Sequence, residues 1–192
     1  RYQALNRTSR EIRYISIQPS FNGDHNSPLV CSLGHLSLDD ANRIQYEALS
    51  YCWWGGFPIT LQHLNQNSTS QEYWVTRNLD AALRSLRRIN QERVLWVDAI
   101  NINQNNPIER GQQVSFMGEI YSEADQVLVL LGEEDASTPI VRRVLETYES
   151  GYPRIENMKE QLPRRVFDRV MRAMDSLLRR PWFSRVWVIQ EV

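Results

Sequence analysis

The 192 residues carry a net charge of −1, and 42% of them are hydrophobic and 23% charged, which is the composition of an ordinary globular domain with a sizeable core. Because the net charge is so small, we expect no field that recruits nucleic acid or an anionic membrane. No apolar run reaches the roughly 18 residues that cross a bilayer, so no membrane span is expected.

Two β-strands are the first elements predicted along the chain. Residues 11–18 alternate partly between apolar and polar side chains, and residues 29–36 form a second β-rich run. A turn-rich loop separates the two runs, which is typical of a β-hairpin. We expect this hairpin to form an N-terminal β extension, residues 1–45, that precedes the core.

The first core strand is predicted over residues 46–51. It ends in the loop 52–58, which contains two tryptophans and two glycines. Glycines there permit a ligand to approach the backbone closely, but they also suit an ordinary tight turn. The runs 59–62 and 72–76 flank a polar stretch and predict a β-ribbon inserted before the next helix.

A helix, a strand, a helix and a strand follow. Asn78 is the predicted N-cap of a helix whose apolar residues recur at helical spacing. Val94–Val97 is an apolar run typical of a strand buried on both faces. Pro107 suits the first turn of a helix that continues to Tyr121. Residues 126–131 predict another doubly buried strand.

Three further helices are predicted. Thr138 caps the first, which runs to Tyr148, and residues 166–178 have the apolar spacing of a longer one. Pro181 ends that helix, and residues 182–192 predict the last. The alternation of strands and helices from residue 46 onward predicts a parallel sheet with helices on both faces.

A cluster of polar side chains follows the buried strand Val94–Val97. In open α/β sheets, ligand sites form at the carboxyl ends of strands. The cluster consists of Asp98, Asn101, Asn103 and Gln104. Asp98 could hold a ribose hydroxyl, or it could cap the next turn or pair with Arg110. Glu109 and Arg110 could form an ion pair, or Arg110 could contact phosphate.

Several other chemistries are excluded. Ser50 lacks the flanking glycines of a nucleophile elbow, and the chain has neither a GxGxxG motif nor a P-loop. The three histidines are scattered, and Cys31 and Cys52 are isolated, so no metal site is expected. Two isolated cysteines also favour a reducing compartment, the cytoplasm.

The chain resembles the fungal heterokaryon-incompatibility (HET) domain, densely over residues 46–132 and loosely elsewhere. The blocks that carry the resemblance are Tyr46–Trp53 with Gly55, Thr76–Leu83, Leu95–Ile100 with Ile102–Gln104, Glu109–Arg110, Gln113–Val114, Met117, Ile120–Tyr121, Ala124, Val127 and Leu131–Gly132. Asn101 stands where the family usually has cysteine, which argues against a required thiol there. Trp54 looks inserted into the usual Cys-Trp-Gly turn.

The resemblance implies a cell-death effector domain, N-terminal in a larger protein and distantly similar to TIR domains. Ser184–Glu191 is similar to the TIR segment in which a tryptophan precedes the catalytic glutamate by four positions, here Trp187 and Glu191. This implies a flavodoxin/TIR-like fold and hydrolysis of NAD, as substrate and without a cofactor, at the nicotinamide–ribose bond. The alternative is that Glu191 is a solvated residue of a last helical turn.

We therefore expect one domain over residues 1–192, with its core at 46–192, cut from a longer protein. Glu191 is the predicted catalytic residue. The residues predicted to shape the NAD pocket are Ser50, Tyr51, Trp53, Asp98, Asn103, Gln104, Arg110 and Trp187. Expected partners are further copies of the chain and other domains of the full-length protein. The rival hypothesis is a non-enzymatic module that signals cell death by homotypic packing.

Overall fold

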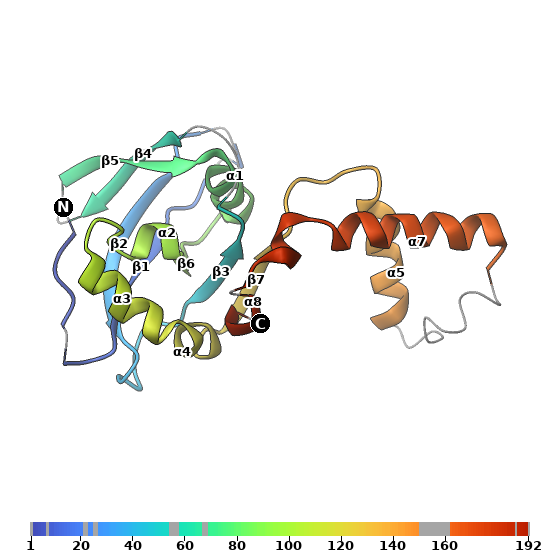
Figure 1. The fold of residues 1–192 in the computed structure, drawn as a ribbon. Helices are drawn as coiled ribbons and strands as arrows, with labels where there is room; N and C mark the ends of the chain where they lie inside the picture. Colours follow the sequence, from blue (N-terminus) through green and yellow to red (C-terminus); the bar gives the residue numbers. More distant parts are fainter. Residues whose placement is uncertain are drawn as a thin grey trace. The chain divides into compact units, whose positions relative to one another are not determined.

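The computed structural model describes residues 2–6, 8–20, 23–24, 27–53, 58–66, 69–149, 162–186 and 188–191, and within them seven strands form one mixed sheet (Figure 1). The strands are β1 (Glu11–Ile17), β2 (Val30–Ser37), β3 (Glu47–Tyr51), β4 (Pro58–Gln66), β5 (Thr69–Thr76), β6 (Arg93–Trp96) and β7 (Gln126–Leu130). Their order across the sheet is β5-β4-β2-β1-β6-β3-β7.

The pairing confirms the predicted hairpin and ribbon and corrects the sheet type. β1 pairs antiparallel with β2, and β4 pairs antiparallel with β5. β3 pairs parallel with both β6 and β7, but β1 pairs antiparallel with β6. The fold is therefore α/β, and the predicted parallel arrangement holds for β6, β3 and β7, whereas the two antiparallel ribbons extend the same sheet beyond them.

The helices between the strands begin and end differently from the prediction. They are α1 (Arg77–Leu86), α2 (Asp98–Asn101), α3 (Pro107–Ser115) and α4 (Met117–Ser122). The Thr76 hydroxyl, rather than Asn78, caps α1 by accepting a hydrogen bond from the N–H of Leu79. The single helix predicted from Pro107 to Tyr121 is broken at Phe116, whose φ of −118° and ψ of 23° are not helical.

Two apolar layers cover the two faces of the sheet. Leu49 and Tyr51 of β3 face a cluster that includes Leu79 and Leu83 of α1. Ala48, one position away and therefore on the opposite face, belongs to a cluster built around α4. The other members of the α4 cluster include Trp96, Met117, Ile120 and Tyr121. β6 contributes to both layers, which confirms the prediction of a strand buried on both faces.

β7 does not have the two buried faces that its apolar sequence predicted. It stands at the end of the strand order beside β3, and Gln126 and Val129 are exposed. An edge strand has a neighbour on one side only, so its apolar residues are less completely covered. The prediction of a doubly buried strand is wrong here because sequence does not show a strand's place in a sheet.

The described chain divides into two units, and each is considered by itself. Unit 1 comprises residues 1–130 and 186–192, and unit 2 comprises residues 131–185. Unit 2 contains α5 (Thr138–Glu149), α7 (Arg164–Leu178) and the 3-10 helix η1 (Pro181–Ser184), and α5 packs against α7. None of the described helices is both long and apolar enough to cross a membrane.

The ends of two predicted helices also change. Thr138 is the first residue of α5, and the Asp135 carboxylate accepts hydrogen bonds from the N–H groups of Ser137 and Thr138. The helix predicted over residues 182–192 is two elements, η1 and the short helix α8 (Val188–Glu191), which belongs to unit 1. Both errors concern local hydrogen bonding that apolar spacing does not report.

Candidate functional site

The carboxyl ends of β3 and β7 lie where the strand order reverses. From β3 the chain proceeds to β6 on one side of β3, and from β6 it crosses to β7 on the other side. The intervening helices cover opposite faces, with α1 on one and α4 on the other. In open α/β sheets, ligands bind outside the carboxyl ends of strands at such a switch point. This edge is therefore the candidate site of unit 1.

Ser50 and Glu191 meet at this edge. The Ser50 hydroxyl donates a hydrogen bond to Glu191 Oε2, although 141 positions separate the two residues. Ser50 shares the α4 face of β3 with Ala48, and α8, which carries Glu191, packs against α4. Glu191 is only 1% exposed. The interpretation of Glu191 as a solvated residue at the end of a helix is therefore wrong.

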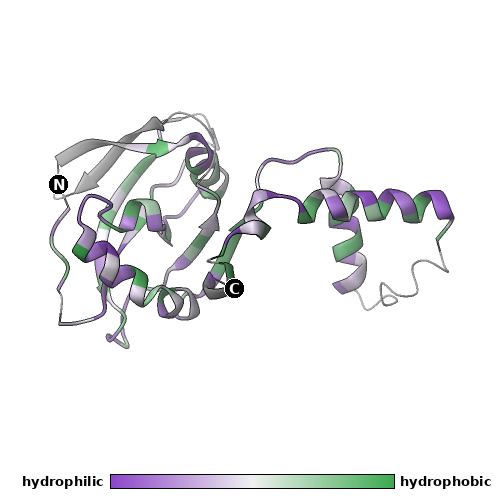
Figure 2. Ribbon diagram, viewed as in Figure 1, coloured by the Kyte–Doolittle hydropathy of each residue, from purple (hydrophilic) through white to green (hydrophobic). Residues whose placement is uncertain are grey.

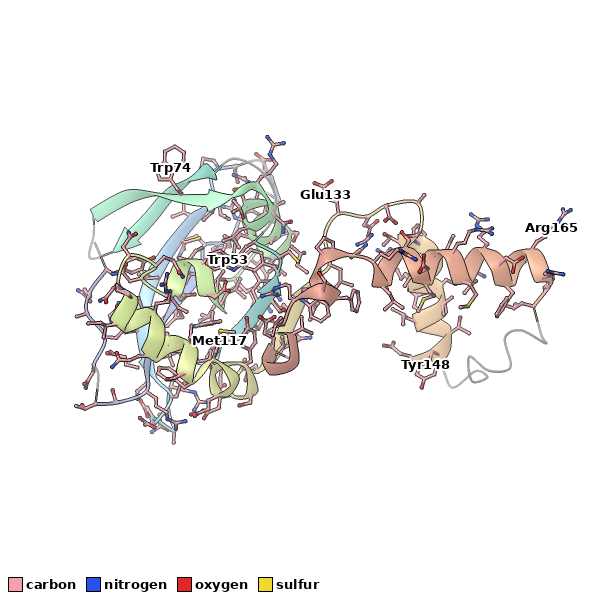
Figure 3. All side chains as sticks on the ribbon, viewed as in Figure 1. Trp53, Trp74, Met117, Glu133, Tyr148 and Arg165 are labelled. Atoms are coloured by element: carbon pink, nitrogen blue, oxygen red, sulfur yellow. The ribbon has the colours of Figure 1, made fainter. Side chains whose placement is uncertain are left out.

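Trp53 and Asp98 form a second contact at the same edge, after the adjacent parallel strands β3 and β6. Trp53 Nε1 donates to Asp98 Oδ2 over 2.9 Å. The indole remains 46% exposed, and Figure 3 labels it among the side chains. The hydrogen bond restrains the ring while a large part of it stays open to solvent. Such a ring can stack on a flat ligand.

Asp98 has a structural role besides its contact with Trp53. Its Oδ1 accepts a hydrogen bond from the N–H of Ala99 over 2.7 Å, within the first turn of α2. Its backbone oxygen accepts from Gln104 Nε2 over 3.0 Å. Asp98 therefore stabilises the turn after β6, which was one of the roles predicted for it. The other alternative, an ion pair with Arg110, is not found among the described residues, where Arg110 is exposed on α3.

Glu109 pairs with Arg13 instead of with Arg110. Arg13 donates to both oxygens of the Glu109 carboxylate, over 2.6 and 3.1 Å, and its side chain is 0% exposed. The ring of Tyr2 lies 4.7 Å from the guanidinium carbon. The N–H of Asn103 donates to the same carboxylate over 2.9 Å. This bidentate ion pair connects β1 to α3.

Sequence reasoning missed Arg13, although one signal could have found it. Arg13 lies on the same face of β1 as Ile15 and Ile17, because residues two apart in a strand point to the same side. Both isoleucines are 0% exposed, so Arg13 occupies an inward-facing position where an apolar residue is usual. A buried guanidinium requires a carboxylate or carbonyl partner. Besides Glu109, it donates to the backbone oxygen of Asn101 over 3.1 Å.

Asn101 occupies the position where the resemblance expected cysteine. It is 0% exposed, and its Oδ1 accepts a hydrogen bond from the N–H of Val97. The side chain closes the turn between β6 and α2 by hydrogen bonding. This position therefore supports the backbone beneath Asp98 and needs no thiol for that role.

The remaining predicted residues lie apart from Ser50 or outside the described part. The Tyr51 side chain is buried in the α1 cluster, on the face opposite to Ser50. Trp187 lies outside the described residues. The structure thus brings Ser50 to Glu191 at this sheet edge, and both Trp53 and Gln104 to Asp98.

The cysteines and histidines show no metal chemistry in the part of the chain that is described. Within it, no group of three histidine, cysteine, aspartate or glutamate side chains is placed to hold a metal ion. Burial raises the pKa of the Cys31 thiol to about 12, and Cys52 is also buried. A thiol with so high a pKa is a poor ligand and a poor nucleophile at neutral pH.

Comparison with known proteins gives one family and one curated relative. The family model described as "Heterokaryon incompatibility protein (HET)" matches residues 46–191. The chain is 27% identical over 225 aligned positions to "Heterokaryon incompatibility protein 6, OR allele" of Neurospora crassa. The alignment covers 98% of this chain and 32% of the relative, so the chain spans about a third of that protein's length. No solved structure matches.

Proposed function

The chain belongs to the heterokaryon incompatibility (HET) family, and from that premise we propose that it is a cell-death effector domain that hydrolyses NAD at the nicotinamide–ribose bond. The observation that carries the proposal is the Glu191 carboxylate, which the Ser50 hydroxyl holds at the switch point of the sheet. One positioned carboxylate is the group that this reaction needs, because its transition state carries positive charge on the ribose.

The proposed reaction requires only NAD and water. The bond between the ribose C1′ and the nicotinamide nitrogen breaks, and its electron pair stays with nicotinamide, which leaves as a neutral molecule. A water oxygen forms the new bond to C1′ and loses a proton. Glu191 stabilises the cationic ribose and orients the water, while Ser50 keeps the carboxylate in one position.

Other residues that the sequence predicted for the pocket suit the rest of the dinucleotide. The exposed ring of Trp53, restrained by Asp98, can stack on nicotinamide or adenine. The guanidinium of Arg110 is exposed on α3 and can contact the pyrophosphate. Asn103 and Gln104 fix the turn after β6 through hydrogen bonds to Glu109 and Asp98. Trp187 stays a predicted pocket residue.

Release of nicotinamide from NAD by the purified chain tests the proposal. Glu191→Gln keeps the shape of the side chain and its ability to accept from Ser50 but removes the negative charge. We expect release to fall by at least 100-fold, the scale of losing one electrostatic stabiliser of a transition state. Glu146→Gln, an exposed position on α5, is the matched control and should behave as wild type.

Thermal unfolding of both variants separates lost chemistry from lost structure. If Glu191→Gln unfolds like the control and releases nicotinamide as fast as wild type, Glu191 is not catalytic. Because self-association is the expected trigger, release should also be measured as a function of protein concentration and in a chemically crosslinked sample.

A second candidate function is a non-enzymatic signalling module that acts through homotypic packing. The burial of Glu191 favours it, since a carboxylate that is 1% exposed is covered from substrate in this conformation. In that case the Ser50–Glu191 hydrogen bond joins α8 to β3 and has no chemical role. Concentration-dependent assembly without nicotinamide release from any assembled sample would favour the module.

A further inference from the structure

The end of unit 2 concentrates positive charge that the net charge of the chain conceals. Residues 164–185 contain seven arginines and two aspartates, a net charge of +5 in a chain whose total is −1. Most of this segment is α7, the longest described helix. Four of these arginines and both aspartates lie on α7, which has a net charge of +2 by itself.

The charged and apolar residues of α7 lie on opposite sides of the helix. At 3.6 residues per turn, all its apolar side chains fall on one arc, and its arginines and aspartates fall on the other. Figure 2 shows the resulting alternation of hydrophilic and hydrophobic segments along α7. The apolar residues are Val166, Phe167, Val170, Met171, Ala173, Met174, Leu177 and Leu178.

Packing of α5 against α7 leaves much of this apolar arc uncovered. Within α7, only Ala173 is buried. The exposed large apolar residues of unit 2 are Leu145, Tyr148, Val166, Met171, Leu178 and Phe183, and the three on α7 (Val166, Met171 and Leu178) are here called the apolar face. Tyr148 of α5 is labelled in Figure 3. The three side chains of the apolar face are each at least 44% exposed, so they are available for contact.

The arginines of α7 are available as well. Arg179 pairs with Asp175, and Arg180 just beyond the helix pairs with Asp135. By contrast, four exposed arginines have no ion pair among the described residues. They are Arg164, Arg165, Arg169 and Arg172. No acidic side chain of the described residues forms an ion pair with them, so their charge can act on an external anion.

We propose that α7 binds the surface of an anionic lipid bilayer. The apolar face enters the boundary between headgroups and acyl chains, and the four unpaired arginines contact lipid phosphates and carboxylates. A strongly amphipathic helix with a basic polar side and low mean hydropathy is the kind that lies in this interface. This inference does not depend on NAD hydrolysis.

Charge decides between the bilayer and other occupants of the apolar face. A second copy packed through the apolar face would cover that face but would leave the arginines on the opposite arc of each helix without an anionic partner. A nucleic acid would neutralise the arginines but would leave the apolar face in water. An anionic bilayer offers acyl chains to the apolar arc of α7 and negatively charged headgroups to its arginines.

Co-sedimentation of the 192-residue chain with vesicles tests the proposal. Vesicles of phosphatidylcholine containing 30% phosphatidylserine should bind the chain, and binding should weaken as salt rises. Pure phosphatidylcholine vesicles should bind it much less. Arg165→Gln together with Arg172→Gln should weaken binding by roughly 30-fold, about fivefold for each arginine. Arg77→Gln, an exposed arginine of α1 in unit 1, should have little effect.

A second pair of variants tests the apolar contribution. Met171→Gln with Leu178→Gln should reduce vesicle binding by at least tenfold, whereas Ile89→Gln with Ile108→Gln changes two comparably exposed positions of unit 1 and should not. Circular dichroism verifies that every variant is folded. The proposal is overturned if the wild-type chain does not bind anionic vesicles. It is overturned likewise if Ile89→Gln with Ile108→Gln reduces vesicle binding as much as Met171→Gln with Leu178→Gln does. It is also overturned if Met171→Gln with Leu178→Gln abolishes a dimer and leaves vesicle binding intact.

Discussion

Units 1 and 2 contain equally clear apolar patterns but bury them to very different extents. In unit 1, α1 covers one face of a sheet, and its Leu79 and Leu83 are 1% and 0% exposed. In unit 2, α7 has an apolar arc as regular as that of α1, yet Met171 and Leu178 are 46% and 55% exposed. Periodicity therefore identifies which side of a helix is apolar, and the opposing layer determines whether that side is buried.

The polar groups of the two units differ in the same way. Arg13 and Glu109 of unit 1 are buried, and each forms hydrogen bonds with the other and with backbone groups. The ion pairs of unit 2 are partly or fully exposed, as between Arg179 and Asp175. We expect substitutions in unit 1 to change folding stability and substitutions on α7 to change binding.

The largest expected effect is that of Arg13→Met. It removes the cation but leaves the Glu109 carboxylate buried without its partner, which should lower the free energy of unfolding by about 3–5 kcal/mol. The measurement is urea unfolding followed by far-ultraviolet circular dichroism. Arg10→Met is the control, because the ion pairs of Arg10 to Asp39 and Glu119 are exposed and should contribute far less. Equal changes in the two variants would contradict a special role for the buried pair.

A matched pair of leucines tests the difference between the units directly. Leu83→Ala deletes a fully buried side chain of α1 and should cost about 2–5 kcal/mol. Leu178→Ala changes an exposed leucine of α7 and should alter the free energy of unfolding by no more than about 0.5 kcal/mol. Urea titrations of both variants give the comparison. A comparable loss for Leu178→Ala would show that the apolar face of unit 2 is covered in the native chain.

Much of the fold follows from local pattern, and the errors arise where distant neighbours decide. Alternation predicted the β1–β2 hairpin, and an unbroken apolar run predicted the doubly buried β6. The same kind of run misled for β7, which stands at a sheet edge. The break at Phe116 between α3 and α4 was missed because helical spacing continues across it.

The contacts among the residues predicted for the site could not be read from the sequence. Ser50 and Glu191 were both named, but their hydrogen bond depends on α8 packing against α4, which no spacing in the sequence reveals. Of the alternatives for Asp98, the turn cap is found and the ion pair with Arg110 is not, and the contact with Trp53 was not foreseen because sequence does not show that Trp53 follows the neighbouring strand. Glu109 finds its cation 96 positions away in Arg13.

The smallest expected effect concerns acid and the start of α5 in unit 2. The hydroxyl and N–H of Ser137 together with the guanidinium of Arg180 hold the pKa of Asp135 well below its ordinary value. A lowered folded-state pKa stabilises the fold fully above the unfolded pKa, about 3.9, and this contribution disappears as the pH falls through the lower folded value. Asp135→Asn should therefore lower the melting temperature slightly at pH 7, and its difference from wild type should shrink below pH 4. Asp168→Asn, an exposed acid of α7 without a hydrogen bond among the described residues, is the matched control for melting curves at both pH values. If the difference in melting temperature between Asp135→Asn and wild type stays constant with pH, the effect comes from the capping hydrogen bonds, which an asparagine retains only in part. In that case the charge of Asp135 does not stabilise unit 2.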